Sequence, residues 1–278
     1  MRLDLVVPNE GEFSQQAVAS CPDFEDMGFG GLWFTDHVVG QRAYQPVYGP
    51  VWLEIMTAMT WAAANTKTIR LGTGVLVVPY RDPVMTAKQL TTIDVLSGGR
   101  VDLGVGTGWS KGEYHALGRG DIFDQRGAVT DESLDVMLRC WEGGEFSWDG
   151  QWSNFRRLEF APTPVQKPRI PLWIGSRGTA PAPLRRVAKY ADVWHPTQLS
   201  PAELKEGAAR VNEMAEREIP TSIRCQYPAD TPINQLQDEL ESYREAGCIQ
   251  AAVDLKSTSH SELMNAVENL ATLISSLK

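Results

Sequence analysis

The first residues in the sequence that could do chemistry are an acid–histidine pair, Asp36-His37, directly after the apolar segment 31–35. A histidine at the end of a strand can donate a hydrogen bond to a ligand or act as a general acid or base. It can equally satisfy backbone groups of its own loop. The pair alone leaves both interpretations open.

Closely spaced glycines interrupt two other apolar segments. Glycine weakens a strand, so it indicates either tight packing inside the fold or a close approach of the backbone to a flat ligand. Stripping one side of a strand of side chains could leave room for a planar ring, with a tryptophan as its wall. The segments read Gly72-Thr73-Gly74 and Gly104-Val105-Gly106-Thr107-Gly108-Trp109, with Glu113 just beyond.

A candidate anion site follows the apolar segment 172–174. A glycine-rich turn between a strand and a helix directs free N–H groups and the positive end of the helix dipole at a negative ligand. Arg177 can add a charge-assisted contact. An ordinary strand-to-helix loop is the alternative interpretation. The turn reads Gly175-Ser176-Arg177-Gly178-Thr179.

Composition disfavours several classes of function. A net charge of −9 disfavours non-specific nucleic-acid binding. No apolar run reaches the roughly 18 residues of a membrane span, and the run at 3–7 is too short for a signal peptide. No His-Glu-x-x-His or Cys-x-x-Cys motif indicates a metal site. We therefore expect a cytoplasmic protein without a metal, whose scattered cysteines are reduced thiols: Cys21, Cys140, Cys225 and Cys248.

The elements that must position these residues alternate between short apolar strands and amphipathic helices. Eight such units of about 35 residues suit a (β/α)₈ TIM barrel, which we predict as a single domain over residues 1–278. An open doubly wound sheet would instead need Gly-x-Gly-x-x-Gly after its first strand, where this chain has Pro8-Asn9-Glu10-Gly11. The expected strands are 3–7, 31–35, 69–78, 100–105, 172–174, 192–194, 222–226 and 251–255. The expected helices are 15–27, 52–64, 83–96, 129–141, 182–190, 201–218, 233–246 and 261–277.

Two further features complete this prediction. The Asp149-Gly150 pair between aromatic residues indicates a hairpin inserted before the fifth strand. Active sites of such barrels lie at the carboxyl ends of the strands. We therefore expect the acid–histidine pair, the glycine-rich segments and the candidate anion site to meet at one mouth.

In their order and spacing, several segments resemble the luciferase-like monooxygenase superfamily, most closely its coenzyme F420-dependent branch. The resemblance covers about residues 1–197 and implies a barrel mouth that holds a flavin-type ring against the third strand. In such proteins this strand often carries a non-proline cis peptide. The segments are 33–38, 69–75, 79–83, 96–100, 104–109 with Glu113, 173–176, 184–188 and 191–194.

The resemblance also implies roles for individual residues. It makes His37 the acid/base or ring-contacting group, and we take His37 and Glu113 as the candidate catalytic residues. The implied cofactor-binding residues are Asp36, His37, Gly72, Thr73, Gly74, Val75, Thr107, Gly108, Trp109, Gly175, Ser176, Arg177 and Gly178. Relatives are often dimers, so we expect a homodimer.

The leading hypothesis is hydride transfer between coenzyme F420 and a small organic substrate, which would lie under the loop 38–52. One alternative is a monooxygenase that uses reduced FMN and dioxygen, and a second is a non-catalytic flavin-binding or assembly protein. FMN has one phosphate, whereas F420 has a longer anionic tail. Candidates for holding that tail are Arg42, Lys111, Arg119, Arg126 and Arg177. Tyr44, Tyr48 and Trp52 are candidates for lining a substrate pocket.

Overall fold

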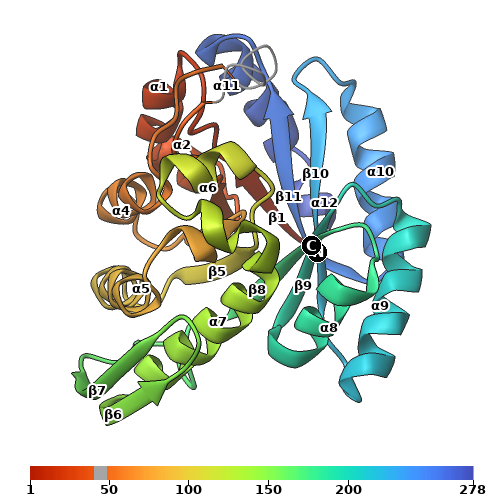
Figure 1. Ribbon diagram of the computed structural model, residues 1–278. Helices are drawn as coiled ribbons and strands as arrows, with labels where there is room; N and C mark the ends of the chain where they lie inside the picture. The colour runs from red at the N-terminus through yellow and green to blue at the C-terminus, as the bar shows by residue number, and fades with distance from the viewer. Residues whose placement is uncertain (41–48, 278) are drawn as a thin grey trace.

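The computed structural model describes residues 1–40 and 49–277. Its main sheet closes on itself, because β3 and β4 both pair with β5 at the end of the strand order β3-β2-β1-β11-β10-β9-β8-β5-β4. Every pairing in this sheet is parallel, which confirms the predicted (β/α)₈ barrel (Figure 1). Its strands are β1 (Arg2–Val6), β2 (Gly31–Phe34), β3 (Arg70–Thr73), β4 (Leu76–Val77), β5 (Val101–Gly106), β8 (Leu172–Arg177), β9 (Val193–Thr197), β10 (Thr221–Pro228) and β11 (Cys248–Lys256).

Helices surround this barrel and connect successive strands (Figure 1). Within the described ranges, none of them is both long and apolar enough to cross a membrane. They are α1 (Ser14–Ala19), α2 (Cys21–Asp26), α4 (Ile55–Asn65), α5 (Pro83–Ser97), α6 (Lys111–Ala116), α7 (Arg126–Glu142), α8 (Pro181–Tyr190), α9 (Pro201–Ala215), α10 (Ile233–Glu245), α11 (His260–Ala271) and α12 (Ile274–Leu277), with 3₁₀ turns η1 (Val78–Tyr80) and η2 (Gly120–Gln125).

Capping residues explain where several helices begin and end. Asp82 accepts a hydrogen bond from the Met85 N–H at the start of α5, and Gly98 ends the helix with φ 72°. Ser200 and Glu203 form a reciprocal capping box on α9. The predicted single helix over 15–27 is wrong, because the chain turns at Ser20 and makes two short helices.

The third barrel strand also differs from the prediction of one strand over 69–78. It consists of β3 and β4, separated by Gly74 and Val75, and the peptide between these two residues is cis. Both halves still pair with β5, so the barrel remains closed. The break places Gly74 and Val75 at the barrel mouth.

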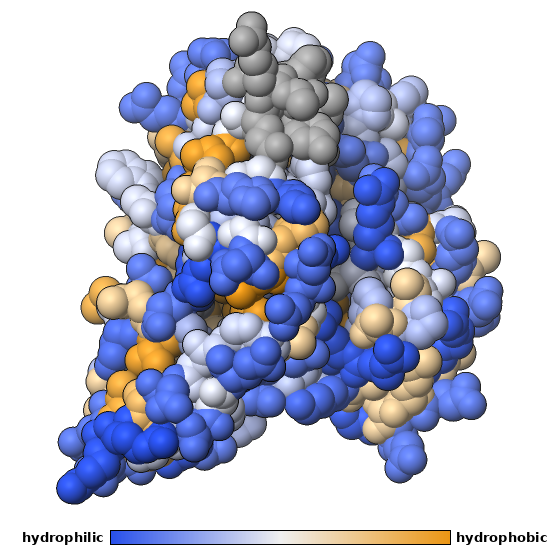
Figure 2. All heavy atoms as spheres, viewed as in Figure 1, coloured by the Kyte–Doolittle hydropathy of each residue, from blue (hydrophilic) through white to orange (hydrophobic). Residues whose placement is uncertain are grey.

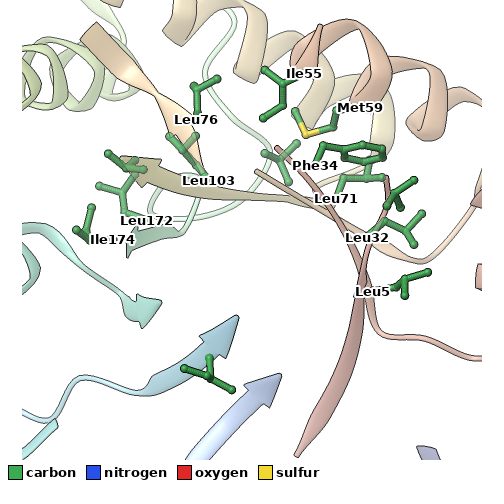
Figure 3. Packing of buried hydrophobic residues seen from close by; sticks show 14 of the residues in the cluster. Leu5, Leu32, Phe34, Ile55, Met59, Leu71, Leu76, Leu103, Leu172 and Ile174 are labelled. Carbon is green, nitrogen blue, oxygen red and sulfur yellow. The ribbon is translucent and has the colours of Figure 1, made fainter. Parts of the chain in front are cut away.

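The main apolar layer lies between the sheet and the surrounding helices. Figure 3 shows Ile55 and Met59 of α4 pointing toward Phe34 of β2, and all three side chains are fully buried. The barrel interior is filled separately by aromatic rings, since Trp33 stacks on His195 at 4.6 Å and meets the edge of Trp173 at 5.1 Å. Inward and outward side chains alternate along each strand, so both layers come from the same segments.

The predicted hairpin is present as β6 (Gly144–Asp149) and β7 (Asn154–Phe160). Glu132 of α7 accepts hydrogen bonds from three backbone N–H groups just beyond Gly150, at Gln151, Trp152 and Ser153. Figure 2 shows apolar side chains where the hairpin meets the barrel and a hydrophilic outer tip. The four cysteines, as predicted, are unpaired, and all are buried.

Candidate active site

A cleft of about 820 Å³ opens where the barrel strands end. Ten of the predicted site residues line it: Asp36, His37, Gly74, Val75, Thr107, Gly108, Trp109, Gly175, Ser176 and Arg177. Four others do not line it: Gly72, Thr73, Glu113 and Gly178. Trp52 lines it as well, whereas Arg42, Tyr44 and Tyr48 lie outside the described residues.

His37 and Glu113 are joined directly. The Nδ1 of His37 lies 2.8 Å from Oε2 of Glu113, and because a carboxylate only accepts, Nδ1 carries the proton. The Trp52 and Trp109 rings lie beside the imidazole at 4.5 and 5.6 Å. Its second nitrogen, Nε2, is therefore the atom through which His37 can exchange a proton with a ligand.

Glu113 acts from behind His37 rather than in the cleft, since its side chain is only 1 % exposed. It accepts the Val38 N–H at 2.8 Å and the Tyr80 hydroxyl at 3.3 Å. Burial alone would raise the pKa of this carboxyl, but the hydrogen bonds from His37 and Val38 outweigh burial and lower it. The resulting carboxylate fixes both the tautomer and the position of His37.

Asp36 is also occupied by the protein itself. Its carboxylate accepts two hydrogen bonds from Arg81, at 2.6 and 2.9 Å, and a third from the Val77 N–H at 2.8 Å. Because Arg81 also pairs with Glu54, Asp36 ties the end of β2 to β4 and to the start of α4. Asp36 borders the cleft while its oxygens hold these elements together.

Val75 forms the floor of the cleft, and two glycines make space for it. A Cβ added at Gly106 would lie 2.4 Å from Cγ2 of Val75, and one at Gly175 would lie 2.8 Å from its Cγ1. The half-buried Val75 side chain therefore reaches from the break between β3 and β4 to Gly106 of β5 and Gly175 of β8. A flat ring at this mouth would rest on Val75.

The sequence left open whether these glycines serve tight packing or a ligand, and at Gly72 and Gly104 the structure shows packing. A Cβ on Gly72 would lie 2.4 Å from the Trp33 indole, and one on Gly104 would lie 1.8 Å from the Thr73 carbonyl oxygen. These glycines accommodate the barrel's own interior. Thr73 is likewise buried and donates its hydroxyl hydrogen to the Gly104 carbonyl.

Three arginines line the cleft near β5 and β8. Arg126 of α7 donates only to carbonyl oxygens, those of Gly108 and Phe123, and neither Arg126 nor the exposed Arg177 has a carboxylate partner among the described residues. Arg186 of α8, which the sequence did not single out, pairs with Asp131 at 2.5 Å. The other tail candidates in the described chain, Lys111 and Arg119, do not line the cleft.

The predicted helix N-terminus beside these arginines offers few backbone donors. Pro181 and Pro183 occupy the first and third positions of α8, and proline has no N–H. The Ser176 hydroxyl is already engaged, since it accepts from Trp194 Nε1 and donates to the Gly178 carbonyl. Guanidinium groups are therefore the main source of anion-binding capacity at this end.

The opposite end of the cleft is lined by alternating charges from β1, β10 and β11. Lys256 contacts Glu10 at 3.0 Å and Asp254 at 3.2 Å. Arg224 contacts Asp254 at 2.7 Å and donates to the Gly74 carbonyl at 2.6 Å. This chain of ion pairs thus runs from the end of β1 to the backbone beside Val75.

Sequence reasoning missed this second end of the cleft. A usable signal was present, because Arg224 and Gln226 alternate along the end of one strand, and Asp254 and Lys256 along the next. Residues two apart on a strand point to the same side. Polar and charged pairs of this kind at the end of a barrel strand are expected on the side that faces the mouth, because the other side packs against apolar helix residues.

Comparison with known proteins decides the family. The family model described as luciferase-like monooxygenase matches residues 9–265. The chain belongs to this family of oxidoreductases. This confirms the resemblance found in the sequence and the expectation that the protein is an enzyme.

Several curated relatives of this luciferase-like chain match over part of their length. An uncharacterised protein of Mycobacterium tuberculosis (strain H37Rv) is 33% identical over 184 residues, which cover 61% of this chain and 63% of that protein. The oxygenase component of a flavin-dependent trigonelline monooxygenase from Acinetobacter baylyi is 31% identical over 115 residues, 41% of this chain and 32% of that protein. The chain therefore aligns with less than two thirds of the length of these relatives.

Solved structures share the fold of this family member almost completely. An F420-dependent secondary alcohol dehydrogenase, in complex with an F420-acetone adduct, has a TM-score of 0.86 at 16% identity, covering 100% of this chain and 99% of that one. The oxygenating constituent of 3,6-diketocamphane monooxygenase from Pseudomonas putida, in complex with FMN, has a TM-score of 0.79 at 13% identity, covering 99% and 98%. Both kinds of cofactor user thus share this barrel.

Proposed function

We propose that this luciferase-like enzyme transfers a hydride between coenzyme F420 and a small organic substrate. The observation that carries the proposal is the pair of arginines, Arg126 and Arg177, that face the cleft without a carboxylate partner in the described chain. A guanidinium that faces a cleft without a carboxylate partner is available for charge-assisted hydrogen bonds to a bound anion. A cofactor with a flat ring and an anionic tail suits both these arginines and the shape of the floor.

The cleft residues fit such a cofactor. Val75 offers an apolar floor for the ring, held from below by Gly106 and Gly175. Arg126 and Arg177 would hold the phosphate, with Arg186 further along α8. When bound, the deazaflavin supplies a two-electron hydride acceptor or donor, and the protein contributes orientation, electrostatics and exclusion of water.

Two features favour F420 over FMN. FMN ends in a phosphate monoester, which binds best where several backbone N–H groups converge, and the prolines at positions 181 and 183 remove two of these donors from α8. F420 carries a phosphodiester followed by carboxylates, which suits the separate guanidinium groups of Arg126 on α7 and Arg177 on β8.

His37 would manage the proton that accompanies the hydride. Oxidation of an alcohol removes a hydride from carbon and a proton from oxygen, and Nε2 of His37 would take that proton. Glu113 would stabilise the imidazolium that forms, because its carboxylate already accepts the Nδ1 hydrogen. In the reverse direction His37 would return the proton to the carbonyl oxygen.

Titration of the purified protein with F420 and with FMN, followed by fluorescence of the ring, tests the proposal. We expect F420 to bind at least tenfold more tightly than FMN, a difference of about 1.4 kcal/mol. Arg177→Ala should weaken F420 binding, whereas Arg185→Ala on the neighbouring exposed surface should not. Tighter binding of FMN would favour the monooxygenase that the trigonelline relative represents. Binding of neither cofactor would favour a non-catalytic protein.

A further inference from the structure

We propose that the substrate of this enzyme is an uncharged polar molecule, such as an alcohol or a ketone, bound where β1, β10 and β11 end. This inference rests on the proposed function in one respect, because it takes a redox ring to occupy the middle of the cleft. It concerns the part of the cleft that such a ring and its tail leave open. Neither the sequence pattern nor the comparisons assign a ligand to this part.

The position follows from the order of strands around the barrel. β1, β11 and β10 are consecutive neighbours, and they lie side by side in Figure 1. β5 and β8, which carry the arginine-lined end, lie on the other side of the barrel. A ring on Val75 with its phosphate at Arg126 and Arg177 leaves the β1–β11–β10 end for the second reactant.

Charge at this end is balanced within the described chain. Two cations, Lys256 and Arg224, alternate with two carboxylates, Glu10 and Asp254, at 3.0, 3.2 and 2.7 Å. Burial alone would raise the pKa of Asp254, but Arg224 and Lys256 outweigh burial and lower it, so the carboxylate is ionised. The arginine-lined end differs, since Arg126 and Arg177 have no such partner there.

One further carboxylate in the lining, Glu239, lies on the helix side of β10. Arg224 and Gln226 face the mouth, so the alternation of side chains turns Cys225 and Tyr227 toward α10, which carries Glu239. Its carboxylate accepts a hydrogen bond from Gln235 of the same helix. Glu239 therefore does not alter the balance on the barrel side.

This balance selects against charged ligands. A carboxylate or phosphate entering here would meet Glu10 and Asp254 and would have to break an existing ion pair, which leaves a buried charge without its partner. An ammonium group would face the same difficulty at Lys256 and Arg224. A hydroxyl or carbonyl group requires no such exchange.

Hydrogen-bonding capacity remains for a neutral group. The Lys256 ammonium has three N–H donors, and Glu10 and Asp254 take one each. Glu10 keeps lone pairs beyond those used by Lys256 and the Thr35 hydroxyl. The Trp52 backbone pairs with Glu10, and its ring lies beside His37, so an apolar wall adjoins these polar groups.

The test uses the holoenzyme and three probes of similar size: 2-pentanone, butyrate and 1-butylammonium. Binding is followed by the change in fluorescence of the bound ring. We expect 2-pentanone to bind at least tenfold more tightly than either ion, about 1.4 kcal/mol. Glu10→Gln leaves Lys256 with an excess of positive charge and should raise butyrate affinity about tenfold, with little change for 2-pentanone. Glu12→Gln, an exposed position outside the cleft lining, is the matched control.

Either of two results overturns the inference. One is failure of 2-pentanone to bind more tightly than the ions, and the other is a butyrate affinity that Glu10→Gln leaves unchanged. The proposed function fails separately, if F420 does not bind. The probes can then be measured with FMN in place, so the two failures are distinguishable.

Discussion

The two ends of the cleft use the same residue types in opposite ways. Near β5 and β8, Arg126 and Arg177 face the cleft with no carboxylate partner among the described residues. Near β1, β10 and β11, Arg224 and Lys256 are held by Asp254 and Glu10. The arginines of the first end can bind a negatively charged ligand, whereas the cations of the second end are already paired with carboxylates of the protein.

This difference teaches that pairing, rather than residue type, determines which ligand a cleft recognises. A guanidinium already paired with a carboxylate is part of the scaffold, and one that faces the cleft without such a partner is available to bind an anion. Val75 and His37 lie between the two ends, where a ring and a substrate would meet.

The largest effect is expected at the meeting point itself. His37→Ala should reduce turnover about 10²–10⁴-fold, because it removes the group that moves the proton. Dissociation constants for cofactor and substrate should change much less. Steady-state kinetics and ring-fluorescence titrations measure the two quantities. Normal turnover with a large loss of melting temperature would make His37 a structural residue.

At the cationic end, replacing both Arg126 and Arg177 by alanine should weaken F420 binding about 100-fold, since each charge-assisted contact contributes about 1.5–3 kcal/mol before losses to solvent. Affinity for 2-pentanone, measured at saturating cofactor, should be unchanged. Arg185→Ala is the matched control on α8. An equal loss in affinity for both ligands would show that the two ends are not independent.

Behind the meeting point, Glu113→Gln should lower the free energy of unfolding at neutral pH by about 2 kcal/mol, the scale of a hydrogen bond to a charged group. The Glu113 pKa is lowered in the folded state, so its carboxylate stabilises the fold above the ordinary pKa of 4.5. That contribution is lost as the pH falls through the lowered value. Chemical denaturation of both proteins across this range should show the gap closing, and a constant gap would contradict the assignment.

On the floor, Gly106→Ala should weaken ring binding about tenfold, because the new Cβ would displace Val75 from its position 2.4 Å away. F420 and FMN should lose affinity alike, since the floor contacts the ring that both share. Adding Val75→Ala should restore part of the affinity by making room. If the double variant binds no better than Gly106→Ala, Val75 is not the floor.

The smallest expected effect is that of salt concentration, which should distinguish the two ends of the cleft without any mutation. Raising the salt concentration from 20 to 300 mM should weaken F420 binding by about threefold to tenfold, through screening of the exposed Arg177 and its neighbours. The affinity of a neutral substrate should stay constant over the same range. Parallel salt dependence of both ligands would mean that charge operates at both ends.

The sequence predicted the barrel well, because the spacing of apolar residues and the order of strands and helices along the chain determine this fold. Alternating strands and helices, and Asp149-Gly150 at the hairpin, are local signals, and the structure agrees with each. The break between β3 and β4 was not predictable in its bounds. It depends on Asp36 binding the Val77 N–H and on Arg224 binding the Gly74 carbonyl, contacts 41 and 150 residues apart.

Placement of the site was predictable only in part. His37, Val75 and Arg177 stand at strand ends, and the cleft includes them. The segment around Gly72 could not show that this glycine makes room for the Trp33 indole, because Trp33 lies on another strand. The sequence also could not show which cations are paired and which are not, because this depends on which carboxylates the fold places beside each arginine or lysine.

A crystal structure of the protein with F420 bound tests the central claim most directly. We predict the ring against Val75, with its phosphate within hydrogen-bond distance of Arg126 or Arg177, and the Glu10–Lys256–Asp254–Arg224 ion pairs intact. A phosphate bound to Lys256 or Arg224, with those ion pairs broken, would contradict the account.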